Sequence, residues 1–308
     1  MAEHRLEGND GAPAANGGQE TAGPGIAELP DDMMVAIFMH LDVKTQLMVV
    51  PSVCKSWARI HRHQMPPARL VFGSGGGFSA AQTATLTDAE MLGIARRVRL
   101  LGSLDLTGCD SVTPFGLKRV LGIHPSITQL TLGRKLATHS VVATLGMCCP
   151  KLVELGLTSD LVLLPAEIGQ LTGLQSLDLS DCEQLGSVPV EIGQLTGLHT
   201  LDLSYCEQLA SLPTEIGQLT GLQTLNLSFC RQLASLPAEI GQLTGLQTLN
   251  LCYCTQLASY LSCCEQLGSL AAEIAQLTGL RVLSLDARLR GNLPDELVQT
   301  LTANGTTL

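Results

Sequence analysis

Aromatic residues are scarce in this chain of 308 residues, at 3% of the sequence, although 45% of the residues are hydrophobic. A core with so few rings must be built from Leu, Ile and Val, which suits a regular, layered interior better than an irregular globule. Long hydrophobic runs are also missing, since none reaches the roughly 18–20 residues that a transmembrane helix needs. We therefore expect a layered aliphatic core and no membrane span.

Basic residues are nearly absent from the second half of the chain. From Lys151 onward there are five Lys or Arg against sixteen Asp or Glu. Arg231 is the only Lys or Arg between Leu161 and Leu280. Such a surface repels nucleic acid and anionic lipid, and it favours a basic partner.

An apolar leader is missing as well. The first 20 residues are polar and include Glu3, Glu7 and Asp10, so they do not resemble a signal peptide. We therefore expect the protein in the cytoplasm or the nucleus, with its eleven cysteines as free thiols. Most cysteines recur once per repeat rather than in the closely spaced pairs of a zinc site, so no bound metal is expected.

One motif, LxxLxL, dominates the chain from Leu101 onward. Its middle leucine recurs after 26, 25, 22, 24, 24, 24 and finally 34 residues. This motif at such a period is the signature of a leucine-rich repeat, in which each unit contributes one short parallel strand and stacked units bury one another's leucines. The middle leucines are Leu104, Leu130, Leu155, Leu177, Leu201, Leu225, Leu249 and Leu283.

The second half of each unit reads LPAEIGQLTG or a close variant. Its proline favours a short extended or 3₁₀ segment over a full helix. A cysteine falls at the Asn/Cys position of the repeat, where a small polar group bonds backbone atoms in the turn after the strand. We therefore predict an α/β solenoid with a parallel concave sheet and an irregular or 3₁₀ convex side. The prolines are Pro165, Pro189, Pro213 and Pro237, and the cysteines are Cys109, Cys182, Cys206, Cys230 and Cys254.

These patterns divide the chain into five segments. We predict that residues 1–25 form a disordered tail and that residues 26–65 form a small all-α module. Residues 66–97 are interpreted as a linker with one short helix, whose capping box is Thr87 with Glu90. The solenoid is predicted over 98–291, and a closing helix with a tail over 292–308, with Leu293, Leu297 and Leu301 on one helix face.

The segment LPDDMMVAIFMHLDVKTQLMVVPSVCKSWARI, residues 29–60, is too short to bury its apolar residues alone. It must pack on the repeats or dock into a partner's groove. The segment resembles an F-box through its Leu-Pro start, its Ile-Phe pair and its closing VCKSW. This resemblance implies a helical module that binds the Skp adaptor of cullin-based ubiquitin ligases. The implied adaptor-binding residues are Leu29, Pro30, Ile37, Phe38, Leu41, Val53, Cys54 and Trp57.

Two columns of residues between and after the leucines are expected to face solvent from the concave sheet. Three aromatic residues share one offset in the repeat and stand beside a row of Asp and Asn, as an apolar strip on an acidic surface. We expect this strip to bind a basic or amphipathic segment of a protein substrate. Ordinary exposed residues on nearly duplicated repeats are the alternative. The candidate substrate face comprises Asp178, Asp202, Tyr205, Asn226, Phe229, Asn250 and Tyr253.

Catalysis finds no support in the sequence. None of the seven histidines has a Cys or Asp partner at motif spacing, and the GSGGG stretch at 73–77 lacks the Lys and Ser or Thr of a phosphate-binding loop. We therefore expect neither enzyme activity nor a cofactor. The interpretation is a substrate-recognition subunit of an SCF-type ubiquitin ligase, which binds a Skp-type adaptor and, through it, a cullin. The alternatives are a helical cap with no adaptor and a leucine-rich repeat scaffold or signalling regulator with no ligase role.

The repeat period breaks between Leu249 and Leu283. The phrase LSCCEQLGS follows LCYCTQLAS after only ten residues, which are too few for a second closed coil. We predict one oversized coil of 34 residues between these two strands. A fault in the gene model is the alternative.

Overall fold

The computed structural model describes residues 68–72, 80–98, 100–158, 160–257, 272–291 and 293–308. The predicted tail over 1–25, the helical module over 26–65 and the adaptor-binding residues Leu29 to Trp57 lie outside these ranges. The surplus residues of the oversized coil, 258–271, lie outside them too.

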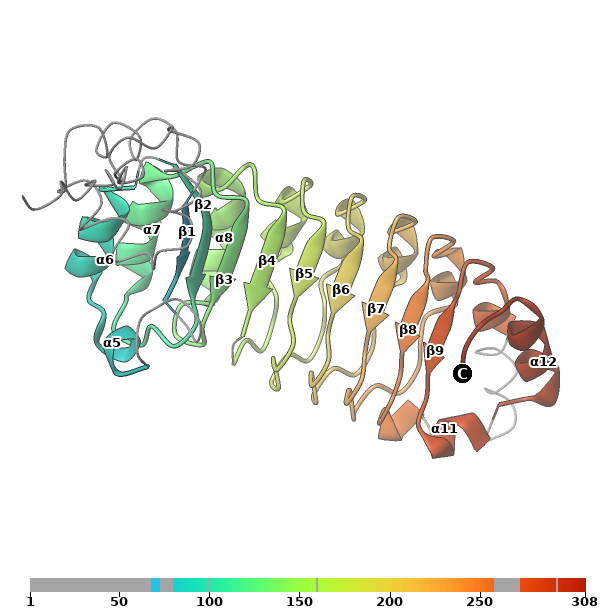
Figure 1. The fold of residues 1–308 in the computed structure, drawn as a ribbon. Coiled ribbons are helices and arrows are strands. Elements are labelled where there is room, and N and C mark those ends of the chain that lie inside the picture. The colour runs from blue at the N-terminus through green and yellow to red at the C-terminus, as the bar shows by residue number, and fades with distance from the viewer. Residues whose placement is uncertain (1–67, 73–79, 99, 159, 258–271, 292) are drawn as a thin grey trace, which may run out of the picture.

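The described chain forms one nine-stranded parallel sheet whose strand order follows the sequence (Figure 1). The middle leucines of the repeats are partners in register from Leu104 to Leu283. Each strand is short because only the LxxLxL stretch runs straight before the chain turns. The predicted α/β solenoid is therefore confirmed. The strands are β1 (Ala68–Val71), β2 (Leu101–Leu106), β3 (Gln129–Leu132), β4 (Glu154–Leu157), β5 (Ser176–Asp178), β6 (Thr200–Asp202), β7 (Thr224–Asn226), β8 (Thr248–Asn250) and β9 (Val282–Ser284).

The first strand lies in the segment that was predicted to be a linker, so this prediction is wrong for residues 68–71. β1 pairs in parallel with β2, and Leu70 and Phe72 are completely buried. This strand covers leucines of β2 that would otherwise be exposed at the open end of the solenoid. It was missed because its sequence, ARLV, carries no LxxLxL motif.

Among the described residues between β1 and β2 there are two helices, α5 (Ala80–Thr85) and α6 (Asp88–Ala95). The short helix predicted from the capping box is α6. The Thr87 backbone N–H donates to Glu90 Oε2 at 2.9 Å, and the Glu90 N–H donates to Thr87 Oγ1 at 3.4 Å. The Asp88 carboxylate accepts from both the backbone N–H and the hydroxyl of Thr113, at 2.7 and 2.6 Å, and so ties this helix to the next coil.

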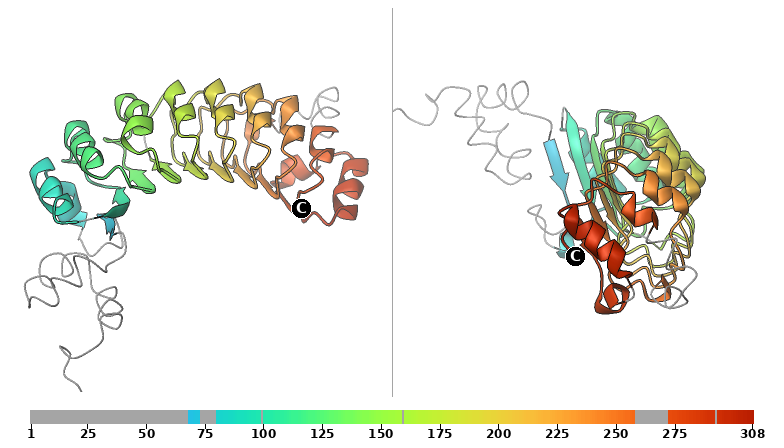
Figure 2. Two further views of the ribbon diagram at one scale, coloured as in Figure 1. Left: turned by 90° about the horizontal axis from the view of Figure 1, so that it is seen from above. Right: turned by 90° about the vertical axis from the view of Figure 1, so that its right-hand side faces the viewer.

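The convex side changes character along the molecule. The coils after β2 and β3 carry full helices, α7 (Pro114–Ile123) and α8 (His139–Cys148), so an irregular or 3₁₀ convex side is wrong there. Later coils carry 3₁₀ turns, as predicted, because each begins with a proline at its N-terminal cap. In both views of Figure 2 these helices and turns cover one face of the sheet. The 3₁₀ turns are η2 (Ala166–Gln170), η3 (Val190–Gln194), η4 (Thr214–Gln218) and η5 (Ala238–Gln242).

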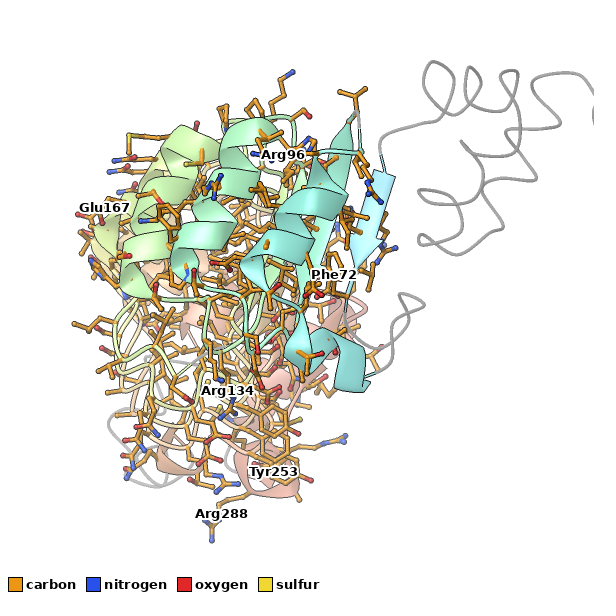
Figure 3. The ribbon with its side chains drawn as sticks, turned by 90° about the vertical axis from the view of Figure 1, so that its left-hand side faces the viewer. Phe72, Arg96, Arg134, Glu167, Tyr253 and Arg288 are labelled. Atoms are coloured by element: carbon orange, nitrogen blue, oxygen red, sulfur yellow. The ribbon has the colours of Figure 1, made fainter. Side chains whose placement is uncertain are left out.

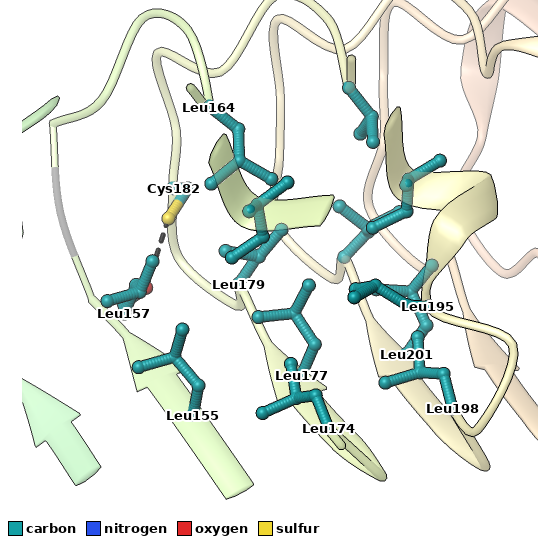
Figure 4. Packing of buried hydrophobic residues seen from close by; sticks show 14 of the residues in the cluster. Leu155, Leu157, Leu164, Leu174, Leu177, Leu179, Cys182, Leu195, Leu198 and Leu201 are labelled. Carbon is teal, nitrogen blue, oxygen red and sulfur yellow. Dashed lines mark hydrogen bonds between the residues drawn. The ribbon is translucent and has the colours of Figure 1, made fainter. Parts of the chain in front are cut away.

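The core is a stack of nearly identical aliphatic layers. In each late coil the leucines of the strand meet an isoleucine and leucines of the convex half (Figure 4). Leu201, Ile216 and Leu219 have no exposed surface. Burying one such side chain contributes about 1.5–3 kcal/mol, and the side chains above and below each layer belong to neighbouring coils.

A glycine and a glutamine interlock adjacent coils on the convex side. A Cβ at Gly217 would lie 2.7 Å from Gln242 Oε1 and 2.8 Å from the Glu239 carbonyl oxygen of the next coil. Gly193 meets Gln218 and the Glu215 carbonyl at 2.7 and 2.8 Å in the same way. The glycine of EIGQL is therefore required by close approach between coils rather than by backbone conformation.

The C-terminal end is closed by a lid. Leu297 and Leu301 of α12 (Asp295–Ala303) are buried, and Leu293 packs against the same core, as predicted. Behind this helix, Thr307 occupies the free edge of β9, where the Leu283 N–H donates to its carbonyl at 2.9 Å. An exposed sheet edge is a template for aggregation, and this last stretch of chain removes it.

The oversized coil is confirmed in its outline. β8 pairs directly with β9, and Leu249 faces Leu283 in register. No described strand therefore intervenes between them, although the sequence between them is ten residues longer than a normal repeat. The short helix α11 (Ala287–Gly291) follows β9 and connects it to the lid.

Gly217→Ala should destabilise the solenoid by about 1–3 kcal/mol, because the new methyl group overlaps a backbone carbonyl that cannot move cheaply. The matched control is Gly93→Ala inside α6, where nothing lies within 4 Å of the added carbon. That change should be neutral or stabilise by up to about 1 kcal/mol. Urea unfolding followed by circular dichroism measures both, and equal midpoints would refute the interlock.

Candidate functional site

The sheet ends in a row of Asp and Asn residues that belong to the predicted substrate face. Asp178, Asp202, Asn226 and Asn250 are the last residues of β5 to β8 and are partners in register. In each, Oδ1 accepts from the backbone N–H two residues further on, at 2.9, 2.8, 3.1 and 3.0 Å respectively. Such a bond closes an Asx turn. One oxygen of each side chain is therefore used to fix the turn at the end of its strand and is already engaged when a ligand binds.

The second polar atom of these side chains is Oδ2 in the aspartates and Nδ2 in the asparagines, and it is not bonded in the same way in every coil. Asp202 Oδ2 accepts from Asn226 Nδ2 at 3.1 Å, which satisfies it within the row. Asp178 is exposed, and no ion pair involves it among the described residues. The negative charge of the row is therefore most available to a partner at Asp178.

The turn then forces one residue per coil into the left-handed region. Asp181, Tyr205, Phe229 and Tyr253 have φ of 59°, 60°, 62° and 63°. For a residue other than glycine, this left-handed conformation costs about 1–2 kcal/mol. The backbone N–H of each of these residues donates to an acceptor in the following coil, and these bonds hold the conformation in place.

The acceptor changes at the end of this series. Asp181, Tyr205 and Phe229 donate to the carbonyls of Ser204, Ser228 and Cys252 at 3.0, 2.9 and 2.8 Å. Tyr253 donates instead to Asp286 Oδ2 at 2.9 Å. The Asp286 side chain thus replaces the carbonyl that a regular next coil would supply. Sequence reasoning missed this role, since Asp286 stands 33 residues after Tyr253.

Because their backbones are identical, the three aromatic side chains stack. The ring centroids of Tyr205 and Phe229 are 4.4 Å apart at an interplanar angle of 7°. Phe229 and Tyr253 are also 4.4 Å apart, at 20°. Tyr205 and Tyr253 are 42% and 52% exposed. We call Tyr205, Phe229 and Tyr253 the aromatic stack; Figure 3 looks along the solenoid and labels Tyr253 at its far end.

The predicted row of exposed rings is thereby confirmed as a geometric feature. One detail was wrong, because the rings lie in the turns after the strands rather than on the strands themselves. A binding role for the row stays a prediction.

The repeats that carry the aromatic stack are acidic. Arg231, the only Lys or Arg between Leu161 and Leu280, is paired, and so is Arg134. Arg231 lies 3.4 Å from Glu207, and Arg134 lies 3.2 Å from Asp160 and 4.0 Å from Glu183. These pairs are largely exposed, so each is worth at most about 1 kcal/mol.

Beneath the turns, the cysteines of the repeat form a buried row. The thiols of Cys182, Cys206, Cys230 and Cys254 donate to the carbonyls of Leu157, Leu179, Leu203 and Leu227 in the preceding coils, at 3.1–3.3 Å. Figure 4 shows the first of these bonds. Burial raises the pKa of the Cys230 thiol to about 12, so it is protonated at neutral pH. The predicted structural role of these cysteines is confirmed.

The part of the chain that the structure describes contains no group of three or more His, Cys, Asp and Glu side chains that could hold a metal ion. None of its helices is long and apolar enough to cross a membrane. The buried His124 uses Nε2 in a 2.9 Å hydrogen bond with the Ala95 carbonyl, so this histidine joins two coils.

Comparisons with known proteins identify two parts of the chain. Residues 26–64 match the F-box-like family model, and residues 183–303 match the model for a leucine-rich repeat region. The first match covers the segment whose resemblance to an F-box was described from its sequence. A search of curated proteins found no significant match.

Solved structures that are similar to parts of this chain include three of different kinds. The plant peptide hormone receptor RGFR1 is 24% identical, with a TM-score of 0.40 over 60% of this chain and 28% of the receptor. The repeat domain of the type III effector XopL is 22% identical, with a TM-score of 0.40 over 66% of this chain and 69% of that domain. A repeat protein of Leptospira interrogans is 23% identical, with a TM-score of 0.31 over 67% and 70%.

The left-handed position makes a testable prediction at Phe229. Both Phe229→Gly and Phe229→Ala remove the ring, but only glycine is relaxed at φ of 62°. The glycine variant should be more stable than the alanine variant by about 1 kcal/mol. At Thr224, on β7, the order should reverse, since glycine weakens a strand. Urea midpoints of the four variants decide the matter, and the same order at both sites would contradict the assignment.

The cysteine row makes a second prediction. Because the thiolate is the reactive form, Cys206, Cys230 and Cys254 should resist iodoacetamide at pH 8 until the solenoid unfolds. Cys148, which is half-buried, should be labelled in the native protein. Peptide mapping by mass spectrometry gives the rate for each residue. Native labelling of Cys230 as fast as Cys148 would show that the row is open to solvent.

Proposed function

The chain is an F-box/leucine-rich repeat protein, and from this premise we propose that it is the substrate-recognition subunit of an SCF-type ubiquitin ligase. F-box domains bind Skp1-type adaptors in general. The observation that carries the proposal is the joining of such a domain to a repeat solenoid in one chain. One part would connect the protein to the ligase, and the other would hold the substrate.

The mechanism is proximity. The protein itself performs no chemistry; it holds a substrate near a conjugating enzyme that is bound elsewhere in the complex. This tethering raises the effective concentration of the acceptor lysine, in the same way that linked binding modules do. The absence of a catalytic motif in the sequence supports this role. Work in the cytoplasm or the nucleus is part of the proposal, since ubiquitin ligases of this class act there.

The adaptor contact is proposed for apolar residues of the F-box-like segment. These residues are Leu29, Pro30, Ile37, Phe38, Leu41, Val53, Cys54 and Trp57, which lie outside the described residues. Trp57 is the only tryptophan of the chain, and tryptophan is enriched among residues that dominate binding energy.

The substrate contact is proposed for the aromatic stack and the exposed Asp178 beside it. Stacked rings present a rigid apolar surface that loses little conformational entropy on binding. The acidic groups around them favour a substrate with a basic segment. A protein substrate is held here, and the adaptor leads to a cullin.

Trp57→Ala should abolish co-purification of the Skp adaptor and the cullin from cells, because truncating a buried aromatic anchor costs about 2–4 kcal/mol of binding. Affinity capture of the full chain, scored by immunoblot for adaptor and cullin, measures this. The matched control is Tyr205→Ser, which alters the proposed substrate contact instead of the adaptor contact. This variant should still capture the adaptor and the cullin. Circular dichroism checks that both variants keep the solenoid.

Two outcomes would overturn the proposal. If the wild-type chain captures neither adaptor nor cullin, the protein is a repeat scaffold with no ligase role. If Trp57→Ala captures as much adaptor as the wild type, the contact has been assigned to the wrong residues.

A further inference from the structure

We propose that Asp181 and the outer face of the Tyr205 ring form a binding site for an arginine side chain of an extended basic segment in the substrate. This inference rests on the proposed function and gives its substrate a chemical class. It concerns the end of the aromatic stack that points toward the N-terminus of the solenoid.

A stack of three rings has only two free faces. Phe229 is covered on both sides, at 4.4 Å from each neighbour, so its ring offers only an edge. Tyr205 and Tyr253 stand at the ends of the stack, where each has one face that no other ring of the stack covers. Arg119 over Phe115 is the one cation–π contact among the described residues, so no described cation of the chain itself occupies either end.

Asp181 occupies the position that a fourth ring would fill. It has the same left-handed backbone as Tyr205, with φ of 59° against 60°, and it stands one coil earlier. Adjacent strands lie about 4.8 Å apart, so its side chain starts beside the base of the Tyr205 ring. An aspartate is much shorter than a tyrosine. The outer part of the ring face therefore stays open above the carboxylate.

The two ends of the aromatic stack differ in the state of their carboxylates. At the Tyr253 end, the oxygens of Asp286 accept from the backbone N–H groups of Tyr253, Arg288 and Leu289, each at 2.9 Å. No hydrogen bond or ion pair involves the Asp181 carboxylate among the described residues. Only the Asp181 end therefore combines an open ring face with an acceptor that is not already used.

This combination selects a planar cation. A guanidinium group can lie flat on a tyrosine face while its N–H groups donate in its own plane to a carboxylate. A lysine ammonium is a compact point charge and cannot stack in this way. Asp178 in the same coil adds a second exposed negative charge, whereas Arg134 and Arg231 are paired with other carboxylates. An acidic side chain would be repelled by these carboxylates.

The experiment measures peptide binding by the full chain. Fluorescein-labelled nona-arginine and nona-lysine serve as probes, and fluorescence anisotropy gives their dissociation constants. We expect nona-arginine to bind more tightly than nona-lysine. Asp181→Asn and Tyr205→Ser should each weaken nona-arginine binding about three- to tenfold, in line with a cation–π contact and a charge-assisted hydrogen bond.

Matched variants separate the site from general charge and from folding. Tyr205→Phe keeps the ring and should bind normally. Glu191→Gln removes the same charge from the convex side, in η3, and should change binding less than twofold. Asp181→Asn keeps the fold, because asparagine tolerates the left-handed region well, so it remains decisive if Tyr205→Ser proves unstable.

Several results would overturn the inference. Unchanged binding by Asp181→Asn would remove the carboxylate from the site. Equal binding of the two probes would reduce the effect to net charge. Self-association of the wild type that Tyr205→Ser abolishes, seen by light scattering, would make the aromatic stack an interface between copies of this chain.

Adaptor capture from the same protein preparations keeps this inference distinct from the proposed function. Loss of the arginine preference with normal adaptor binding contradicts the inference alone. An intact arginine preference with no adaptor binding contradicts the ligase role and leaves the site standing as a property of the solenoid.

Discussion

The whole structure depends on the fact that a single coil of about 24 residues cannot bury its own leucines. Leu201 and Leu225 are fully buried only because each is sandwiched between the same leucine of the coils before and after it. Every coil must therefore repeat its neighbour's backbone closely. The two ends of the array, where one neighbour is missing, require the separate solutions seen in β1 and Phe72 at one end and α12 with Thr307 at the other.

This enforced repetition also makes the exposed surface. The Asx turn places one residue per coil at the same left-handed φ. The side chains at that position therefore form a row along the solenoid. Three aromatic residues in that row stack without any further selection for their geometry. The cysteine row and the interlocked Gly and Gln pairs arise from the same rule on the inner and convex sides. Recognition and stability thus share one backbone, and a change that perturbs the turn will alter both.

The sequence predicts the regular part of the fold because there each residue's environment repeats. The LxxLxL register, the buried cysteines, the row of rings and the closing helix could all be predicted from spacing. The failures lie where the repetition stops or changes. β1 carries no motif, and α7 and α8 replace 3₁₀ turns in coils that lack the LPAEIGQLTG phrase. Asp286 acts through a contact that does not follow from the repeat period. At such places the outcome depends on tertiary packing, which spacing alone does not encode.

The same reasoning locates specificity within an otherwise uniform surface. Identical coils offer a ligand identical contacts. A surface made only of such coils therefore cannot fix the register in which an extended partner binds. Register must be set where the repetition is interrupted. The row of aromatic side chains gives way to Asp181 on one side. On the other side it ends at Tyr253, whose N–H donates to the Asp286 side chain. Since the Asp286 carboxylate is consumed in closing the solenoid, Asp181 is the interruption that remains available to distinguish one position of a bound chain from the next.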